Sequence, residues 1–114
     1  MNLKKLRIVV DEREKKSGIP DFLKKTGINL EIKTLQVGDY IVAPESVVER
    51  KTISDLASSI FDGRLFDQCN RLKEHYKFPI LLIESNQLAQ IRANLNSSVR
   101  LIQTSYNSIE SVDI

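Results

Sequence analysis

Acidic and basic residues that could act together on one substrate lie in two short runs, Gly38-Asp39 and Glu49-Arg50-Lys51. Alternate side chains of a β-strand share a face, so Glu49 and Lys51 are expected on one face and Arg50 on the other. The turn between the runs decides what Asp39 meets. An odd turn, such as residues 43–45, places Asp39 opposite Glu49, whereas an even turn places it opposite Arg50. The site we predict requires Asp39 and Glu49 to converge.

Two converging carboxylates suit Mg²⁺, a hard cation that takes oxygen ligands and keeps several waters, and Mn²⁺ could replace it. Such an ion polarises a phosphodiester and lowers the pKa of an attacking water, while a nearby lysine orients that water or offsets developing charge. Asp39, Glu49 and Lys51 therefore have the chemistry of a phosphodiesterase site. The alternative is a same-face ion pair between Glu49 and Lys51, which is common on strands.

The surrounding sequence predicts alternating strands and helices that would position this site. Strands are expected at 6–10, 28–32, 39–42, 47–51, 79–84 and 99–103. The first of these strands ends in the charged segment 11–16. Helices are expected at about 20–26, 53–60, 64–76 and, more weakly, 87–95. The strands at 39–42 and 47–51 form a hairpin, and a bend follows the strand at 28–32. Ile109 and Val112 in the tail have helical spacing. This order predicts a three-layer α/β domain with a central mixed sheet flanked by helices.

The composition is that of one globular domain over residues 1–114. The net charge of +2 is too small to indicate a nucleic-acid partner by itself. The single cysteine, Cys69, has the spacing of a core residue and suits a reducing, intracellular setting. No apolar run is long enough to span a membrane, so we expect a soluble protein with no membrane contact.

The segment 8–84, about two thirds of the chain, resembles the nuclease domain of the XPF family of structure-specific DNA endonucleases, which includes archaeal XPF and Hef proteins. The matching blocks occur in the family's order and keep its Gly-Asp…Glu-Arg-Lys-x-x-x-Asp signature. They are Val10-Asp11-Glu12-Arg13-Glu14, Val37-Gly38-Asp39-Tyr40-Ile41, Val48-Glu49-Arg50-Lys51 with Asp55, Gly63-Arg64-Leu65-Phe66-Asp67-Gln68 and Pro79-Ile80-Leu81-Leu82-Ile83-Glu84. The resemblance implies a restriction-endonuclease-like fold.

The resemblance also implies roles for individual residues. Asp39 and Glu49 would be metal ligands, Lys51 would serve the attacking water and Asp11 would add another acidic group. The charged surround would be completed by Arg13, Arg50 and Asp55, with Arg50 bracing the site from the other face of its strand. Asp55 has a structural alternative, because an acid three residues after Thr52 completes a helix capping box.

A polar row on the predicted helix 64–76 is the expected DNA-contact surface beyond the acidic residues. Arg64, Gln68 and Arg71 share one helix face and match family positions. Guanidinium groups hold phosphates through paired hydrogen bonds, so these residues and Arg13 are the expected DNA-binding set.

The resemblance implies a metal-dependent endonuclease that hydrolyses a phosphodiester near a branch in DNA, such as a 3′ flap, splayed arm or fork, in repair or fork processing. Family members pair their nuclease domains and carry a helix-hairpin-helix domain after this one, so a homodimer and such a following domain are expected. Residues 85–114 carry only four charged side chains and are the expected pairing surface. A sliding clamp would bind, if at all, outside this chain. The alternative function is a non-catalytic subunit that keeps the fold for dimerisation and DNA binding.

Overall fold

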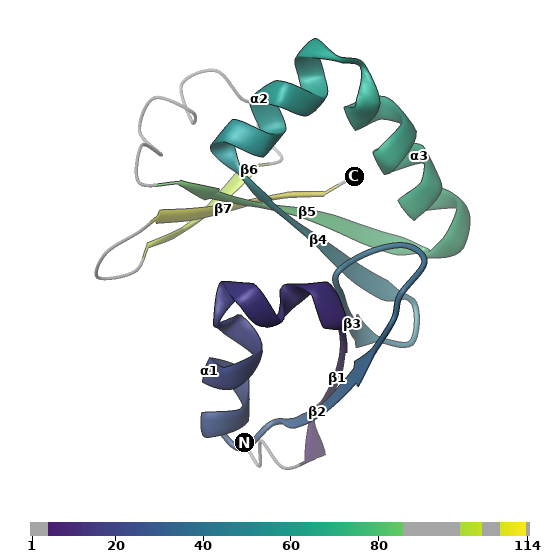
Figure 1. Cartoon of the computed structure of the whole chain (residues 1–114). Coiled ribbons are helices and arrows are strands. Elements are labelled where there is room, and N and C mark those ends of the chain that lie inside the picture. The colour runs from purple at the N-terminus through teal and green to yellow at the C-terminus, as the bar shows by residue number, and fades with distance from the viewer. Residues whose placement is uncertain (1–4, 86–98, 104–107, 114) are drawn as a thin grey trace.

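The structure, a computed structural model, describes residues 5–85, 99–103 and 108–113, and within these ranges seven strands form one sheet (Figure 1). The sheet has the order β2-β1-β3-β4-β5-β7-β6. The strands are β1 (Arg7–Asp11), β2 (Asn29–Lys33), β3 (Tyr40–Ala43), β4 (Ser46–Thr52), β5 (Phe78–Ser85), β6 (Val99–Gln103) and β7 (Ser108–Asp113). The helices are the 3-10 helix η2 (Glu12–Ser17), α1 (Ile19–Lys25), α2 (Ile53–Phe61) and α3 (Arg64–His75).

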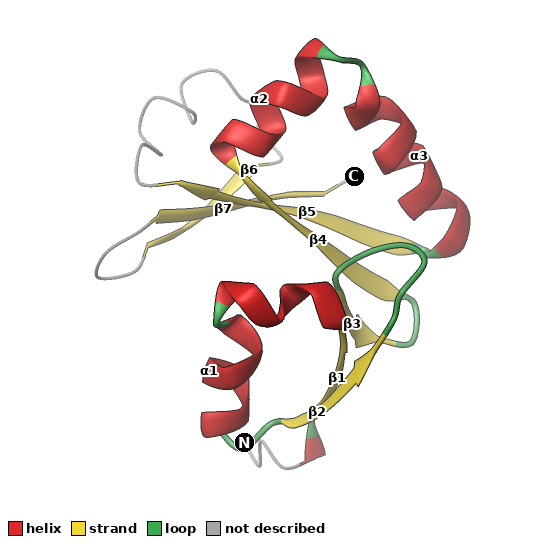
Figure 2. Cartoon of the chain, in the orientation of Figure 1, coloured by secondary structure: helices red, strands yellow, loops and turns green. Residues whose placement is uncertain are grey.

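Helices lie on both faces of this sheet, which confirms the predicted three-layer α/β architecture (Figure 2). Helices α2 and α3 lie on one side, and η2 and α1 lie on the other, within the curve of β1 and β2. The sheet is mixed, because β1 pairs with β2 and β4 with β5 in parallel while the remaining pairs are antiparallel. Pro20 in the first turn of α1 and Thr52 at the N-cap of α2 begin their helices as the sequence predicts.

The core lies mainly between β4, β5 and the α2–α3 pair. Leu56 of α2 packs against Leu81 and Ile83, which lie on one face of β5. Val47 of β4 and Leu72 of α3 are also buried. Helix α2 packs against β4 and β5, and α3 packs against β5.

The β3–β4 hairpin sets the register of the predicted site. Tyr40 pairs with Val48 and Ile41 with Val47, and continuing this register by one residue places Asp39 opposite Glu49. The turn itself has two residues, 44 and 45, so an odd turn is the wrong explanation for this register. A register shift between Ile41 and Ala43 inserts the extra residue into β3 instead.

The predicted elements from residue 6 to 85 are confirmed, with boundaries that shift by at most one residue. The charged segment after β1 forms the 3-10 helix η2. The helical spacing of Ile109 and Val112 is misleading, because 108–113 pairs with both β5 and β6 as strand β7, and these long-range hydrogen bonds override a local period. The helix predicted at 87–95 lies outside the described residues. No helix in the described ranges is long and apolar enough to cross a membrane.

Candidate active site

Asp39 is fixed through both its backbone and its side chain. Its backbone N–H donates to Val48 O at 3.0 Å, and its carbonyl accepts from Asp11 N at 2.9 Å. Its carboxylate oxygen Oδ2 accepts the backbone N–H of Arg50 at 2.8 Å. Asp39 therefore joins β1 to β4 and presents a carboxylate of defined orientation at the start of β3.

The Glu49 carboxyl group lies beside that of Asp39. Burial and then the adjacent Asp39 charge raise the pKa of Glu49 to about 7, and burial is the largest cause of the raised pKa of Asp39. Asp39 and Glu49 also line one cavity. The predicted convergence of Asp39 and Glu49 is therefore present in the structure.

Lys51 follows Glu49 on the same face of β4 and is buried, with 8% of the residue exposed. Burial raises the pKa values of Glu49 and of Cys69 on α3, and the positive charge of Lys51 partly offsets both increases. Within residues 5–85 it makes no ion pair, so the same-face salt bridge with Glu49 is absent there. Cys69 is half-buried, and burial raises the pKa of its thiol.

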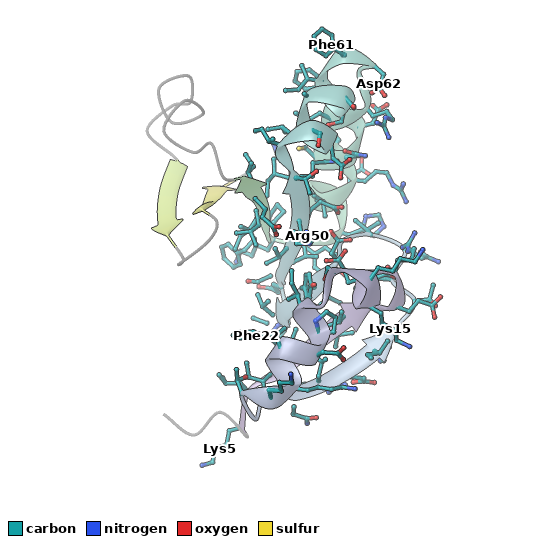
Figure 3. All side chains as sticks on the ribbon, turned by 60° about the vertical axis from the view of Figure 1, so that its left-hand side comes forward. Lys5, Lys15, Phe22, Arg50, Phe61 and Asp62 are labelled. Atoms are coloured by element: carbon teal, nitrogen blue, oxygen red, sulfur yellow. The ribbon has the colours of Figure 1, made fainter. Side chains whose placement is uncertain are left out.

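Arg50 points to the opposite side of β4 from Glu49 and Lys51, as the strand period predicts. Its Nε donates to Glu14 Oε1 of η2 at 2.9 Å, and its Nη1 donates to Glu84 Oε2 of β5 at 3.2 Å. Figure 3 shows Arg50 midway along the molecule, between the end that carries Lys15 and Phe22 and the end that carries Phe61 and Asp62. Its guanidinium is thus committed to two other carboxylates, and only its backbone contacts Asp39.

Asp11 is 1% exposed at the end of β1, and its carboxylate is fully engaged. Oδ1 accepts from Leu35 N at 2.8 Å and from Arg13 Nη2 at 3.2 Å, while Oδ2 accepts from Arg13 N at 3.1 Å and Nε at 2.7 Å. The Arg13 hydrogen bonds outweigh burial and lower the pKa of Asp11. Arg13 also donates to Leu35 O at 2.9 Å. Asp11 is therefore an anchor that holds Arg13 and the 35–38 loop.

A cavity of about 340 Å³ collects most of these groups. Its carboxylates are those of Asp39, Glu49 and Asp11, and its guanidiniums are those of Arg13 and Arg71. The cavity is lined by Asp11, Arg13, Gln36, Val37, Gly38, Asp39, Glu49, Gln68, Arg71 and Leu72. Acidic and cationic groups thus face one concave space, as binding of a metal ion together with a phosphate would require.

Gly38 allows the loop to reach this cavity. Its φ of +86° is in the left-handed region, and a Cβ there would lie 2.2 Å from Val47 Cγ2. The position directly before Asp39 therefore requires glycine for both its conformation and its space.

The predicted DNA-contact row on α3 is divided by the structure. Gln68 and Arg71 line the cavity, and Arg71 Nη2 donates weakly to Gln36 O at 3.5 Å. Gln68 Oε1 is buried without a hydrogen-bond partner among the described residues. Arg64 lies outside the cavity lining and is paired with Asp62, Nε to Oδ2 at 2.7 Å.

Asp55 also lies outside the cavity lining, exposed in the first turn of α2. Its backbone N–H donates to Thr52 Oγ1 at 3.2 Å, so the first half of the predicted capping box is present. The carboxylate lies near the positive end of the helix dipole, which it stabilises.

The donor set fits a divalent cation of the Mg²⁺ type. Two half-buried carboxylates supply oxygen ligands, and burial is the largest cause of the raised pKa of each. No cluster of three or more His, Cys, Asp or Glu side chains within the described ranges is arranged to hold a metal. A cation at this site would therefore take two side-chain ligands and fill its shell from water or substrate.

Sequence reasoning missed the two side-chain partners of Arg50, Glu14 and Glu84, and the loop residue Gln36, which lines the cavity. Glu84 could have been found, because parallel pairing of β4 with β5 places Glu84 level with Thr52, which is two residues from Arg50 and on the same face of β4. Glu14 and Gln36 carried no comparable signal, since their approach depends on how η2 and the loop pack.

The chain belongs to the ERCC4 domain family, whose model matches residues 10–112. This match and the fold together define an XPF-family nuclease domain, in agreement with the predicted resemblance.

Individual relatives agree with that assignment. The chain is 51% identical over 81 residues to the 3′-flap repair endonuclease Xpf of Saccharolobus solfataricus and 51% identical over 77 residues to the DNA repair endonuclease XPF of Mus musculus. These alignments cover 71% and 68% of this chain, but only 35% and 8% of the relatives. The structure of XPF from Aeropyrum pernix in complex with DNA superposes with a TM-score of 0.66 at 46% identity, over 69% of this chain and 40% of that one.

Proposed function

We propose that this chain is the nuclease domain of a metal-dependent, structure-specific DNA endonuclease. The observation that carries the proposal is the meeting of Asp39 and Glu49 at a cavity that Arg13 and Arg71 also line. The carboxylates would hold Mg²⁺ or Mn²⁺, and the guanidiniums would hold phosphate oxygens.

The residues of the chain divide the work of phosphodiester hydrolysis. Asp39, oriented by the Arg50 N–H, and Glu49 are the ligands, and the bound ion would lower the pKa of an attacking water and polarise the phosphodiester. Lys51 follows Glu49 on the same face of β4 and makes no ion pair in the described part of the chain, so it would orient the attacking water or offset the negative charge that develops on the phosphate. Asp11 holds Arg13 at the cavity rim.

The proposed substrate is branched DNA, because the relatives are named as a 3′-flap repair endonuclease and DNA repair endonucleases, and a solved relative is in complex with DNA. Flaps, splayed arms and forks share a junction of duplex and single strand. We propose that the domain acts as a homodimer in the longer protein. A sliding clamp would contact regions outside this chain. We also propose an intracellular, DNA-associated location.

Cleavage of end-labelled duplex, splayed-arm and 3′-flap DNA tests the proposal, with Mg²⁺, Mn²⁺ or a chelator, and with Mn²⁺ affinity measured by calorimetry in parallel. The variant is Asp39→Ala. The matched control is Glu45→Gln, which neutralises an exposed carboxylate in the hairpin turn. We expect metal-dependent cutting of the branched DNAs, and loss of both cutting and Mn²⁺ binding in Asp39→Ala alone.

Two results would count against the proposal. Equal Mn²⁺ affinity in the parent and Asp39→Ala proteins would remove the metal site. Mn²⁺ binding without any cutting, by the chain and also when joined to a relative's DNA-binding domain, would favour the non-catalytic subunit.

A further inference from the structure

Arg50 is the point at which three elements of the fold are joined. Its side chain, 18% exposed, reaches Glu14 on η2 and Glu84 on β5, whose side chains are 12% and 31% exposed. Ion pairs this far from solvent fix geometry more strongly than surface pairs, because losing one partner leaves a poorly solvated charge. The network is therefore a rigid connection between the η2 side of the fold and the central strands.

The same residue holds the Asp39 carboxylate through its backbone. Strand β3 begins at Tyr40, while β4 continues to Thr52, so the N–H of Arg50 is past the paired part of the hairpin. That N–H donates to Asp39 Oδ2 at 2.8 Å. The orientation of Asp39 thus depends on where the backbone of Arg50 lies, and the side chain of Arg50 restrains that backbone.

Glu14 has a second buried neighbour. The Tyr40 hydroxyl is buried without a hydrogen-bond partner among the described residues, and burial is the largest cause of the raised pKa of this phenol. Glu14 itself is fixed by the hydrogen bond from Arg50 Nε at 2.9 Å.

We propose that Glu14 and Glu84 are positioning residues that orient the Asp39 carboxylate through Arg50. Glu14 and Glu84 contact neither substrate nor metal in this scheme. This proposal extends the proposed function. Its expected effect on metal binding rests on that function, whereas the positioning of Asp39 by Arg50 does not.

The direct test measures hydrogen exchange of the Arg50 amide by NMR in the metal-free chain. Glu14→Gln and Glu84→Gln preserve side-chain size and remove one ion pair each. Glu31→Gln removes the exposed pairs with Arg7 and Lys33 at the β2 edge and serves as the control. We expect exchange of the Arg50 amide to become at least about tenfold faster in the two test variants only. Thermal unfolding checks that each variant is folded. Unchanged exchange in both test variants would overturn the proposal.

Mn²⁺ affinity separates positioning from simple charge. Neutralising Glu14 removes a negative charge near Asp39 and would weaken cation binding on either account. Arg50→Gln removes a positive charge, so charge alone predicts tighter binding, whereas positioning predicts binding weaker by about tenfold or more, as for other residues that orient metal ligands. Arg50→Lys keeps the charge and loses the two-pronged contact, so it gives the same comparison if Arg50→Gln does not fold.

The outcomes for the two proposals remain distinct. No Mn²⁺ binding by the parent chain would refute the metal site, while amide exchange would still decide the positioning role. Mn²⁺ binding by Arg50→Gln or Arg50→Lys at parental strength or tighter would refute positioning and leave the metal site intact.

Discussion

The Asp39 carboxylate accepts the backbone N–H of Arg50 at 2.8 Å, directly beyond the last register pair of the β3–β4 hairpin. The contact satisfies a backbone donor that no strand neighbour takes, and it turns Asp39 towards Glu49. The bulge near Val42 is what brings these residues level. One irregularity in a short hairpin therefore sets the geometry of the proposed metal site.

The first prediction concerns pH and the metal-free protein. The Glu49 pKa rises from 4.5 to about 7 on folding, so the folded state binds this proton more tightly than the unfolded chain. The stabilisation from Glu49 is present below about pH 4.5 and is lost as pH rises through about 7. We expect thermal unfolding to show that the parent protein loses stability between pH 5 and 8 and that Glu49→Gln does not show the part of this loss that comes from Glu49. Saturating Mg²⁺ should offset it in the parent protein, because cation binding favours the ionised pair. If the stabilities of parent and variant changed with pH in parallel, the raised pKa of Glu49 would be contradicted.

The second prediction concerns Gly38. Alanine there must adopt a left-handed conformation, which costs about 1 kcal/mol or more, and its Cβ must displace Val47. Overpacking typically adds about 1–3 kcal/mol, so we expect Gly38→Ala to lose about 3 kcal/mol in urea unfolding. Gly27→Ala is the control, since Gly27 has a φ of +92° with nothing within 4 Å and should lose only about 1 kcal/mol. Equal losses would show that the close approach to Val47 is unimportant.

Much of this organisation follows from local patterns in the sequence. Alternation along residues 46–52 predicts that Arg50 points away from Glu49 and Lys51, and Thr52 predicts the start of α2. These features depend on the period of a strand or on one cap, so neighbours in the sequence are enough to define them. The Asp39–Glu49 register was left open by the sequence, because a bulge and a turn change it in the same way.

The remaining features depend on contacts across the fold. Arg50 meets Glu14 across 36 residues of sequence, and no local pattern encodes that contact. Its contact with Glu84, across 34 residues, depends on the pairing of β4 with β5. The tail from 108 to 113 has helical spacing but forms β7, because β5 and β6 offer it hydrogen bonds on both sides. Arg64 and Arg71 share a helix face, yet only Arg71 lines the cavity, because the 35–38 loop reaches that end of α3.

The third prediction concerns Asp11. Its buried carboxylate receives hydrogen bonds from Arg13 and Leu35, and bonds of this charged kind contribute about 1.5–3 kcal/mol. We expect Asp11→Asn to lower the free energy of unfolding by about 2 kcal/mol at pH 7. Because folding lowers the Asp11 pKa, its stabilisation is present above its ordinary value of 3.8 and is lost as pH falls below it. The free energies of unfolding of the variant and the parent should therefore converge at acidic pH. Asp21→Asn, at an exposed site on α1, should change stability by less than about 0.5 kcal/mol. If the difference in free energy of unfolding stayed constant down to the pH of acid unfolding, the Asp11 contribution would not depend on its charge.

The last prediction separates the two arginines of the α3 row. Arg71 lines the cavity and makes no ion pair in the described residues, whereas Arg64 is neutralised by Asp62. If phosphate enters the cavity, Arg71→Gln should weaken splayed-arm binding and reduce the slope of log affinity against log salt by about 1. Arg64→Gln, with the same chemical change on the same helix, should alter affinity and slope much less. Fluorescence anisotropy over a salt series, in Ca²⁺ to prevent cutting, measures both. A larger loss in Arg64→Gln would place the DNA path over the α2–α3 corner and away from the cavity.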